Sequence, residues 1–140
     1  MEKRMYKVVT RILALTILGL LAFSLAPAQT APAKFDIPFD FTVGKTSLPA
    51  GLYTVKALSD SVMQVESLAR PEGVLVITHK TQGKTASENC TLTFHRYGEQ
   101  YFMSSLKTPG SDVVREVMSN RHEKDLARRS SGAEILVAAR

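Results

Sequence analysis

Residues 35–43 read FDIPFDFTV, and this stretch decides the fold. Apolar side chains occupy every second position from Phe35 to Val43, and polar residues or proline stand between them. Such an alternation is typical of a β-strand with one buried face. Pro38 has no N–H to donate to a neighbouring strand, so we expect an edge strand or a bulge at this position. The stretch therefore predicts a domain built from β-sheet.

Further strands are expected on the C-terminal side of this stretch. Alternating or β-branched runs predict strands at 53–57, 62–68, 74–78, 89–96, 101–108, 112–117 and 134–139. The run 74–78 (VLVIT) is typical of a central strand that is well buried. Gly98, in the connection 97–100, supplies the permissive backbone that a hairpin turn needs.

One helix is expected near the C-terminus, at 119–129 (SNRHEKDLARR). Asn120 is a candidate N-cap, and Glu123, three residues later, completes a capping-box pattern. Leu126 and Ala127 are the only apolar residues of this segment, so the helix is expected on the surface. The predicted fold class is all-β: an antiparallel sandwich or small barrel of about seven or eight short strands with one short surface helix.

The first 28 residues have the three parts of a cleavable export signal. Four basic residues precede an apolar run at 12–25, and Ala26-Pro27-Ala28 is a small-x-small cleavage site before Gln29. The run is shorter than the about 20 residues that a membrane-crossing helix needs, which favours cleavage over a retained anchor. We therefore expect an exported protein, periplasmic or secreted, with no membrane attachment after cleavage. A second possible cut follows Ala33.

Processing sets the domain organisation and the charge of the mature chain. We expect residues 1–28 to be removed, 29–34 to form a flexible lead and 35–140 to fold as a single β-domain. Because four of the 18 Lys and Arg lie in the signal, its removal takes away most of the formal net charge of +5. No basic stripe with interleaved aromatic residues remains, so no nucleic-acid partner is expected. Cys90 is the single cysteine, which excludes an intrachain disulfide and favours a small buried residue.

Three segments carry a resemblance to a known family. Residues 39–44 (FDFTVG), 48–55 (LPAGLYTV) and 94–102 (FHRYGEQYF) resemble the motifs of a family of small exported bacterial β-proteins. Members share a PFDF…G…LPAGxYxV opening and an FxRYG…YF hairpin, followed by a charged helix. The resemblance implies a fold and an exported location, and it implies no activity.

The sequence shows no compact catalytic or metal-binding pattern. His79, His95 and His122 are widely spaced, whereas a zinc site needs three or four ligands that converge. Cys90 and His95 lie an odd number of residues apart, so an unbroken strand points them to opposite faces. Asp36 and Asp40 would lie about 13 Å apart on one strand, beyond the separation that glycosidases use. No nucleophile elbow, phosphate-binding glycine loop or dinucleotide fingerprint is present, so no cofactor is expected.

Three functions remain open on this reasoning. The first is a non-catalytic exported domain that acts by binding or as an envelope component. The second is a carrier of a small hydrophobic ligand in a cavity lined by aromatic rings. The candidate lining residues, for which a solid core is the simpler interpretation, are Phe35, Phe39, Phe41, Tyr53, Phe94 and Phe102. The third function is a small hydrolase or metal-dependent enzyme.

Overall fold

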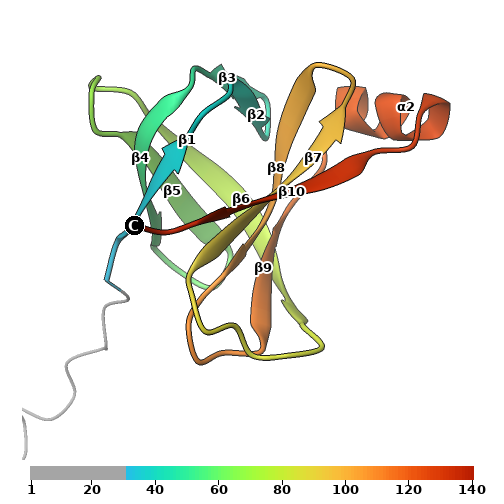
Figure 1. Cartoon of the computed structure of the whole chain (residues 1–140). Helices are drawn as coiled ribbons and strands as arrows, with labels where there is room; N and C mark the ends of the chain where they lie inside the picture. Colours follow the sequence, from blue (N-terminus) through green and yellow to red (C-terminus); the bar gives the residue numbers. More distant parts are fainter. Residues whose placement is uncertain (1–30) are drawn as a thin grey trace, which may run out of the picture.

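The computed structural model describes residues 31–140, which form ten strands and one helix (Figure 1). The expected export signal, with Ala26, Ala28 and Gln29 at its cleavage site, lies outside the described residues. The elements are β1 Ala33–Ile37, β2 Phe41–Val43, β3 Thr46–Leu48, β4 Gly51–Ala57, β5 Val62–Ser67, β6 Gly73–Gln82, β7 Thr91–Tyr97, β8 Gln100–Lys107, β9 Val113–Val117, α2 Arg121–Arg129 and β10 Ala133–Ala138. This is the predicted all-β fold with a short C-terminal helix. No helix within residues 31–140 is long and apolar enough to span a bilayer.

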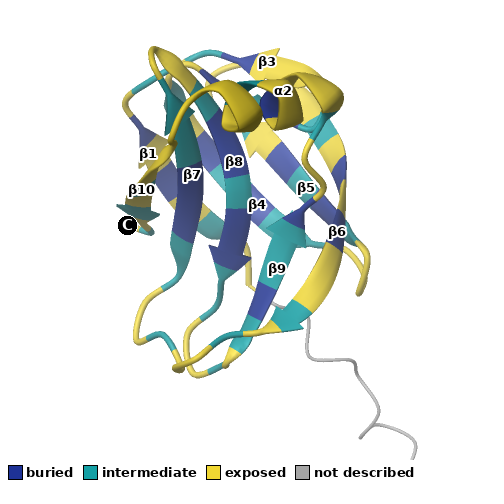
Figure 2. Ribbon diagram, turned by 90° about the vertical axis from the view of Figure 1, so that its right-hand side faces the viewer, coloured by how far each residue is buried: buried dark blue, intermediate teal, exposed yellow. Residues whose placement is uncertain are grey.

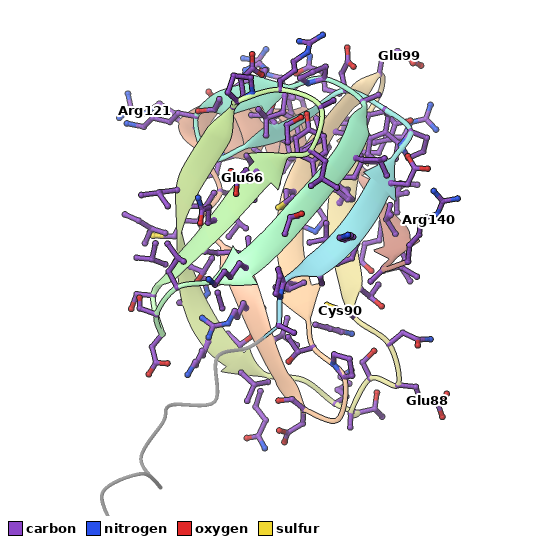
Figure 3. All side chains as sticks on the ribbon, turned by 90° about the vertical axis from the view of Figure 1, so that its left-hand side faces the viewer. Glu66, Glu88, Cys90, Glu99, Arg121 and Arg140 are labelled. Atoms are coloured by element: carbon purple, nitrogen blue, oxygen red, sulfur yellow. The ribbon has the colours of Figure 1, made fainter. Side chains whose placement is uncertain are left out.

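The strands form one open, mixed sheet in the order β1-β4-β5-β6-β9-β8, and β8 continues both to β7 and β10 and to β2 and β3. Each described pair is antiparallel, as expected, except β2 with β8, which are parallel at Thr42 and Phe102. The two ends of the sheet approach each other, and Figure 3 shows Arg140 beside β1. The backbone N–H of Arg140 donates to the Lys34 carbonyl at 3.0 Å, and its guanidinium lies 3.4 Å from the Asp36 carboxylate.

The predicted strand at 35–43 is divided into two strands with different partners. β1 pairs with β4, whereas β2 pairs with β3 and β8. Pro38 lies in the break between them, and β1 is an edge strand, as the missing N–H predicts. Ala33 and Lys34, expected in the flexible lead, pair with Val55 and Thr54 and belong to β1. This division, together with the short strand β3, which lies outside the predicted strands, raises the strand count of residues 31–140 to ten, above the seven or eight expected.

The core consists of the side chains that alternate inward on these strands. Phe35, Ile37, Phe41 and Val43 are all buried, so the inward face predicted for residues 35–43 is confirmed. Tyr53 is buried with them, and its hydroxyl donates to the Pro49 carbonyl at 2.6 Å. This bond ties the turn before β4 to the strand that follows it.

Strand β6 is central but only half buried, which corrects the expectation for residues 74–78. Val76 and Thr78 face the core, whereas Leu75 and Ile77 face outward on a strand that Figure 2 shows as largely exposed. A run of apolar residues does not distinguish a strand buried on both faces from one that keeps apolar side chains on its surface. Leu75 and Ile77 therefore form an exposed apolar pair, and clustered exposed apolar residues are a feature of binding surfaces.

The β7–β8 hairpin is close to the prediction, and its arms are joined by a two-residue turn in which Gly98 has φ +64°. The pairing shifts between Thr93 and Phe94, because Thr93 lies opposite Ser105 while Phe94 lies opposite Met103. Ser104 is therefore the extra residue of a β-bulge. Bulges re-aim side chains, and this one changes which residues of β8 face outward.

Helix α2 begins after Asn120, whose side-chain oxygen accepts from the Glu123 N–H at 2.7 Å, so the predicted N-cap is confirmed. The prediction that Glu123 completes a capping box is wrong. The Glu123 carboxylate is buried and lies 3.1 Å from Nδ1 of His95 on β7 instead of returning to the Asn120 backbone. The helix is otherwise exposed, as expected.

Candidate functional site: an apolar cleft in the sheet

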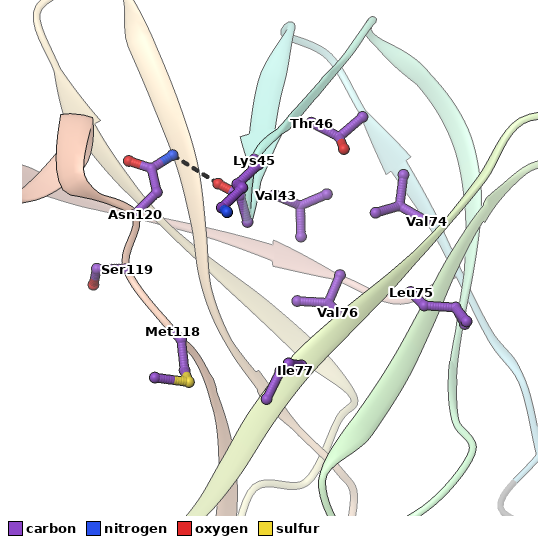
Figure 4. Close-up of a pocket in the computed structure, with 11 residues that line it drawn as sticks. Val43, Lys45, Thr46, Val74, Leu75, Val76, Ile77, Met118, Ser119 and Asn120 are labelled. Carbon is purple, nitrogen blue, oxygen red and sulfur yellow. Dashed lines mark hydrogen bonds between the residues drawn. The ribbon is translucent and has the colours of Figure 1, made fainter.

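The candidate site is a cleft formed where β6 changes its partner. Gly73 to Ile77 pair with β5, and only the second half of β6, from Thr78 onward, pairs with β9. The β2–β3 hairpin lies across from the first half of β6, and no strand of residues 31–140 fills the space between them. The segment that links β9 to α2 closes one end (Figure 4). The cleft is therefore a split between two parts of one sheet.

The surface of the cleft is mainly apolar. Its volume is about 360 Å³, and it is lined by residues 43–46, 74–77 and 118–120. Three large apolar residues of this lining are unusually accessible: Leu75 and Ile77 are each 65% exposed, and Met118 is 59% exposed. Clustered exposed apolar residues mark binding surfaces in soluble proteins, and the volume falls within the range of ligand pockets, about 300–1,000 Å³.

The backbone of β6 adds unpaired polar groups to this apolar surface. The Thr78 N–H donates toward β5, to the Ser61 carbonyl at 2.8 Å, whereas the Ile77 carbonyl accepts from the Met118 N–H on the opposite side. Backbone groups alternate in direction along an antiparallel strand, so the N–H and C=O of Leu75 also point away from β5 and into the cleft. The cleft therefore offers an open strand edge, which is a template for an added strand.

Asn120 holds two walls of the cleft together. Its Nδ2 donates to the Gly44 carbonyl at 2.6 Å, shown as a dashed line in Figure 4, while its Oδ1 caps α2. Gly44 has φ +59°, a left-handed conformation that suits the tight turn between β2 and β3. Among the described lining residues Lys45 is the one with a charge, and none carries a carboxylate, imidazole or thiol. Thr46 and Ser119 contribute hydroxyls, but no carboxylate or imidazole of the lining is present to activate them, so this composition suits binding.

The six aromatic residues predicted to line a ligand cavity lie elsewhere. Phe35, Phe41, Tyr53 and Phe94 belong to one core cluster, in which the Phe41 ring lies 5.2 Å from that of Tyr53 and 5.4 Å from that of Phe94. Phe39, at the margin of this cluster, stacks on Tyr101.

Phe102 faces the other side of the sheet, where it packs near Tyr97 and His122. The structure therefore brings five of the six together and separates the sixth, and none of them lines the cleft.

The other candidate residues of the sequence occupy separate places. The histidines have different partners: His79 contacts Glu116, His95 contacts Glu123, and His122 contacts Gln100. Across the described part of the chain, no group of three or more His, Cys, Asp or Glu side chains is placed to hold a metal ion.

Asp40 accepts from the Ala50 N–H at 2.8 Å, a turn contact, whereas Asp36 contacts Arg140. Cys90 is half-buried against the core rather than fully buried, and burial raises the pKa of its thiol. It lies at the β1 side of the molecule in Figure 3, away from the cleft.

Sequence reasoning missed the cleft, because it assigned residues 74–77 to a buried strand. One residue of the sequence could have indicated the cleft. Met118 is apolar and directly follows β9, but it does not continue an alternating pattern that would place it in the core. Comparison of the chain with models of protein families, with curated proteins and with solved structures found no match.

Proposed function

We propose that this chain is an exported, non-catalytic binding protein, acting in the periplasm or outside the cell, whose cleft takes an extended apolar peptide segment. Export is supported by the basic, apolar and small-residue pattern of residues 1–28. Binding is supported by an accessible apolar cleft whose described lining offers no carboxylate or imidazole to activate its hydroxyls.

The observation that carries the peptide proposal is the open edge at Leu75. A peptide added along β6 would pair its main chain with the Leu75 N–H and C=O and place alternate side chains against Ile77, Met118 and the cleft floor. A small hydrophobic ligand would cover the apolar side chains and leave these backbone groups unpaired. Strand addition satisfies both features, and we favour it over a carrier function for that reason.

The test is selection from a library of random peptides on the mature protein, followed by fluorescence anisotropy with the selected peptide. Leu75→Pro removes the outward N–H without removing a hydrogen bond to β5, so it should abolish peptide binding while the protein stays folded. Leu75→Thr is the matched control, since it keeps the N–H and strand propensity and should weaken binding only moderately. Ile77→Lys, at an exposed position, removes apolar contact without touching the edge.

Selected peptides that are apolar, adopt an extended conformation and lose binding in Leu75→Pro would support the proposal. Equal affinity for Leu75→Pro and the wild type would overturn it. Recovery of no peptide, together with binding of the apolar dye 1-anilinonaphthalene-8-sulfonate that Ile77→Lys abolishes, would overturn it in favour of a small-ligand carrier.

A further inference from the structure

A second concave surface lies on the outer face of β6, β9, β8, β7 and β10, and it contains the hydroxyl groups of Thr93 and Ser105. The groove has a volume of about 890 Å³. Thr93 and Ser105 line it, and each is only 7% exposed. The side-chain hydrogen bonds of this face are made by His79, Thr81 and His95 and involve neither hydroxyl. Neither hydroxyl has a bonded partner among the described residues, where Thr78 Oγ1 is the one fully buried side-chain polar atom without a partner. The hydroxyls of Thr93 and Ser105 are therefore accessible from the groove and available to a ligand.

These hydroxyls are part of a polar row that crosses five strands. The register places His79 beside Glu116, Glu116 beside Ser105, Ser105 beside Thr93 and Thr93 beside Leu136. Cross-strand neighbours share a face, so this row forms the floor of the groove. The β-bulge adds Ser104 to the same lining.

The carboxylate of Glu116 is held in a fixed position within this row. His79 Nε2 lies 3.0 Å from its Oε2, and the Thr81 hydroxyl donates to its Oε1 at 2.9 Å. The groove thus presents hydroxyls that donate or accept and an oriented carboxylate that accepts. Glu116 stands between Ser105 and His79, so the row does not place the imidazole next to the serine, as a catalytic triad requires.

Three lysines line the groove beside the row. Lys107 lies two residues beyond Ser105 on β8, Lys124 lies on α2, and Lys84 precedes β7. Together they outnumber the two carboxylates of the lining, Glu116 and Glu134. Strands β9, β8 and β7, which carry Glu116, Ser105 and Thr93, have neighbours on both sides, so no free backbone edge lies beside these three residues. Recognition here must use side chains.

We infer that this groove binds an anionic oligosaccharide. Sugar hydroxyls match the donors and acceptors of Thr93, Ser105 and Glu116, and carboxylate or sulfate groups along the saccharide match Lys107 and Lys124. The groove adjoins the cleft between β2–β3 and β6 at Met118 and Ser119, but Thr93, Ser105 and Glu116 line the groove alone. The inference therefore does not depend on peptide binding in the cleft.

The test is an array of neutral and anionic oligosaccharides that includes galacturonate, glucuronate and sulfated tetrasaccharides, with poly-glutamate as a charge-only probe. The best binder is then titrated calorimetrically. Ser105→Ala and Lys107→Gln should each weaken binding by about tenfold, because each removes a direct polar partner. Lys34→Gln and Thr54→Ala, on β1 and β4 away from the groove, are the matched controls and should bind as the wild type does.

Selective binding of anionic saccharides that falls in the two groove variants and not in the controls would support the inference. Three results would overturn it: no saccharide bound, binding that is indifferent to Ser105→Ala and Lys107→Gln, or poly-glutamate bound as tightly as the best saccharide. A saccharide bound equally by Leu75→Pro and the wild type separates this site from the cleft.

Discussion

The buried carboxylate of Glu123 lies 3.1 Å from Nδ1 of His95, and this contact fastens α2 to strand β7. The helix has few apolar residues with which to bury itself, so a polar contact takes part of the role of a hydrophobic stripe. His95 is itself only partly exposed, which protects the pair from water.

We expect His95→Ala to lower the free energy of unfolding by about 1–3 kcal/mol, because it leaves a buried carboxylate without its partner. Urea unfolding followed by circular dichroism measures the change. His122→Ala, which removes an exposed histidine of the same helix, is the control and should change stability by less than about 0.5 kcal/mol. Equal effects of the two substitutions would contradict the role given to the pair.

Substitutions at Asn120 separate the helix cap from the tether to the β2–β3 turn. Asn120→Asp keeps an oxygen that accepts from the Glu123 N–H but has no donor for the Gly44 carbonyl, so it should loosen the hairpin and leave the helix capped. Asn120→Ala removes both hydrogen bonds and should lower the free energy of unfolding by about 1 kcal/mol more than Asn120→Asp does. Hydrogen exchange of the Thr46 amide reports the hairpin. An unchanged exchange rate in Asn120→Asp would show that the tether does not hold it.

Thr78 carries a buried hydroxyl that has no hydrogen-bond partner among the described residues. Thr78→Val replaces this hydroxyl with a methyl group of similar size, so we expect the free energy of unfolding to rise by about 1 kcal/mol. Thr81→Val, three residues along β6, removes a hydroxyl that donates to Glu116 and should have the opposite sign. Thermal unfolding of the two variants tests this contrast, and a destabilised Thr78→Val protein would contradict it.

The alkaline stability of the protein should depend on Tyr53. Burial, and then the negative charge of Glu72, raises the pKa of its phenol above the ordinary value of 10.0. The pKa of Tyr53 is higher in the folded state than in the unfolded state, so the neutral phenol contributes to the stability of the fold. This contribution to stability is complete below pH 10 and is lost as the pH rises through the folded-state pKa.

Tyr53→Phe removes the hydrogen bond to the Pro49 carbonyl, so the free energy of unfolding should fall by about 1 kcal/mol at neutral pH. The variant has no phenol to titrate at position 53, so its stability should decline less steeply above pH 10. Denaturant unfolding at a series of pH values measures both effects. Tyr101→Phe, at a ring that stacks on Phe39, is the comparison. If the stability of Tyr53→Phe declined above pH 10 as steeply as that of the wild type, Tyr53 would not control the loss of stability at alkaline pH.

Alternation predicted the strands and their inward faces, because it reports directly which side chains avoid water. It predicted Phe35 and Val43 correctly even though β1 and β2 pair with different strands. The pairing itself lies beyond a single sequence: nothing within residues 41–43 specifies a parallel neighbour sixty residues later on β8.

The sites were harder to predict than the strands. The cleft depends on apolar residues that stay on the surface, and periodicity assigns such residues to the core. The groove depends on a bulge, although adjacent Ser104 and Ser105 do interrupt the alternation of β8 in the sequence. The aromatic character of Phe102 does not reveal the face of the sheet on which it lies. Aromatic character alone therefore groups Phe102 with the core rings, although it lies on the other face.

The contact between Arg140 and Lys34 has a mechanical consequence. It places β1 and the end of β10 side by side, so tension applied at residues 31 and 140 pulls on two neighbouring points of the sheet. Such a load breaks this contact first and then peels β1 from β4, one hydrogen bond after another from Ala33 onward. The domain would therefore unzip at low force rather than resist by shear.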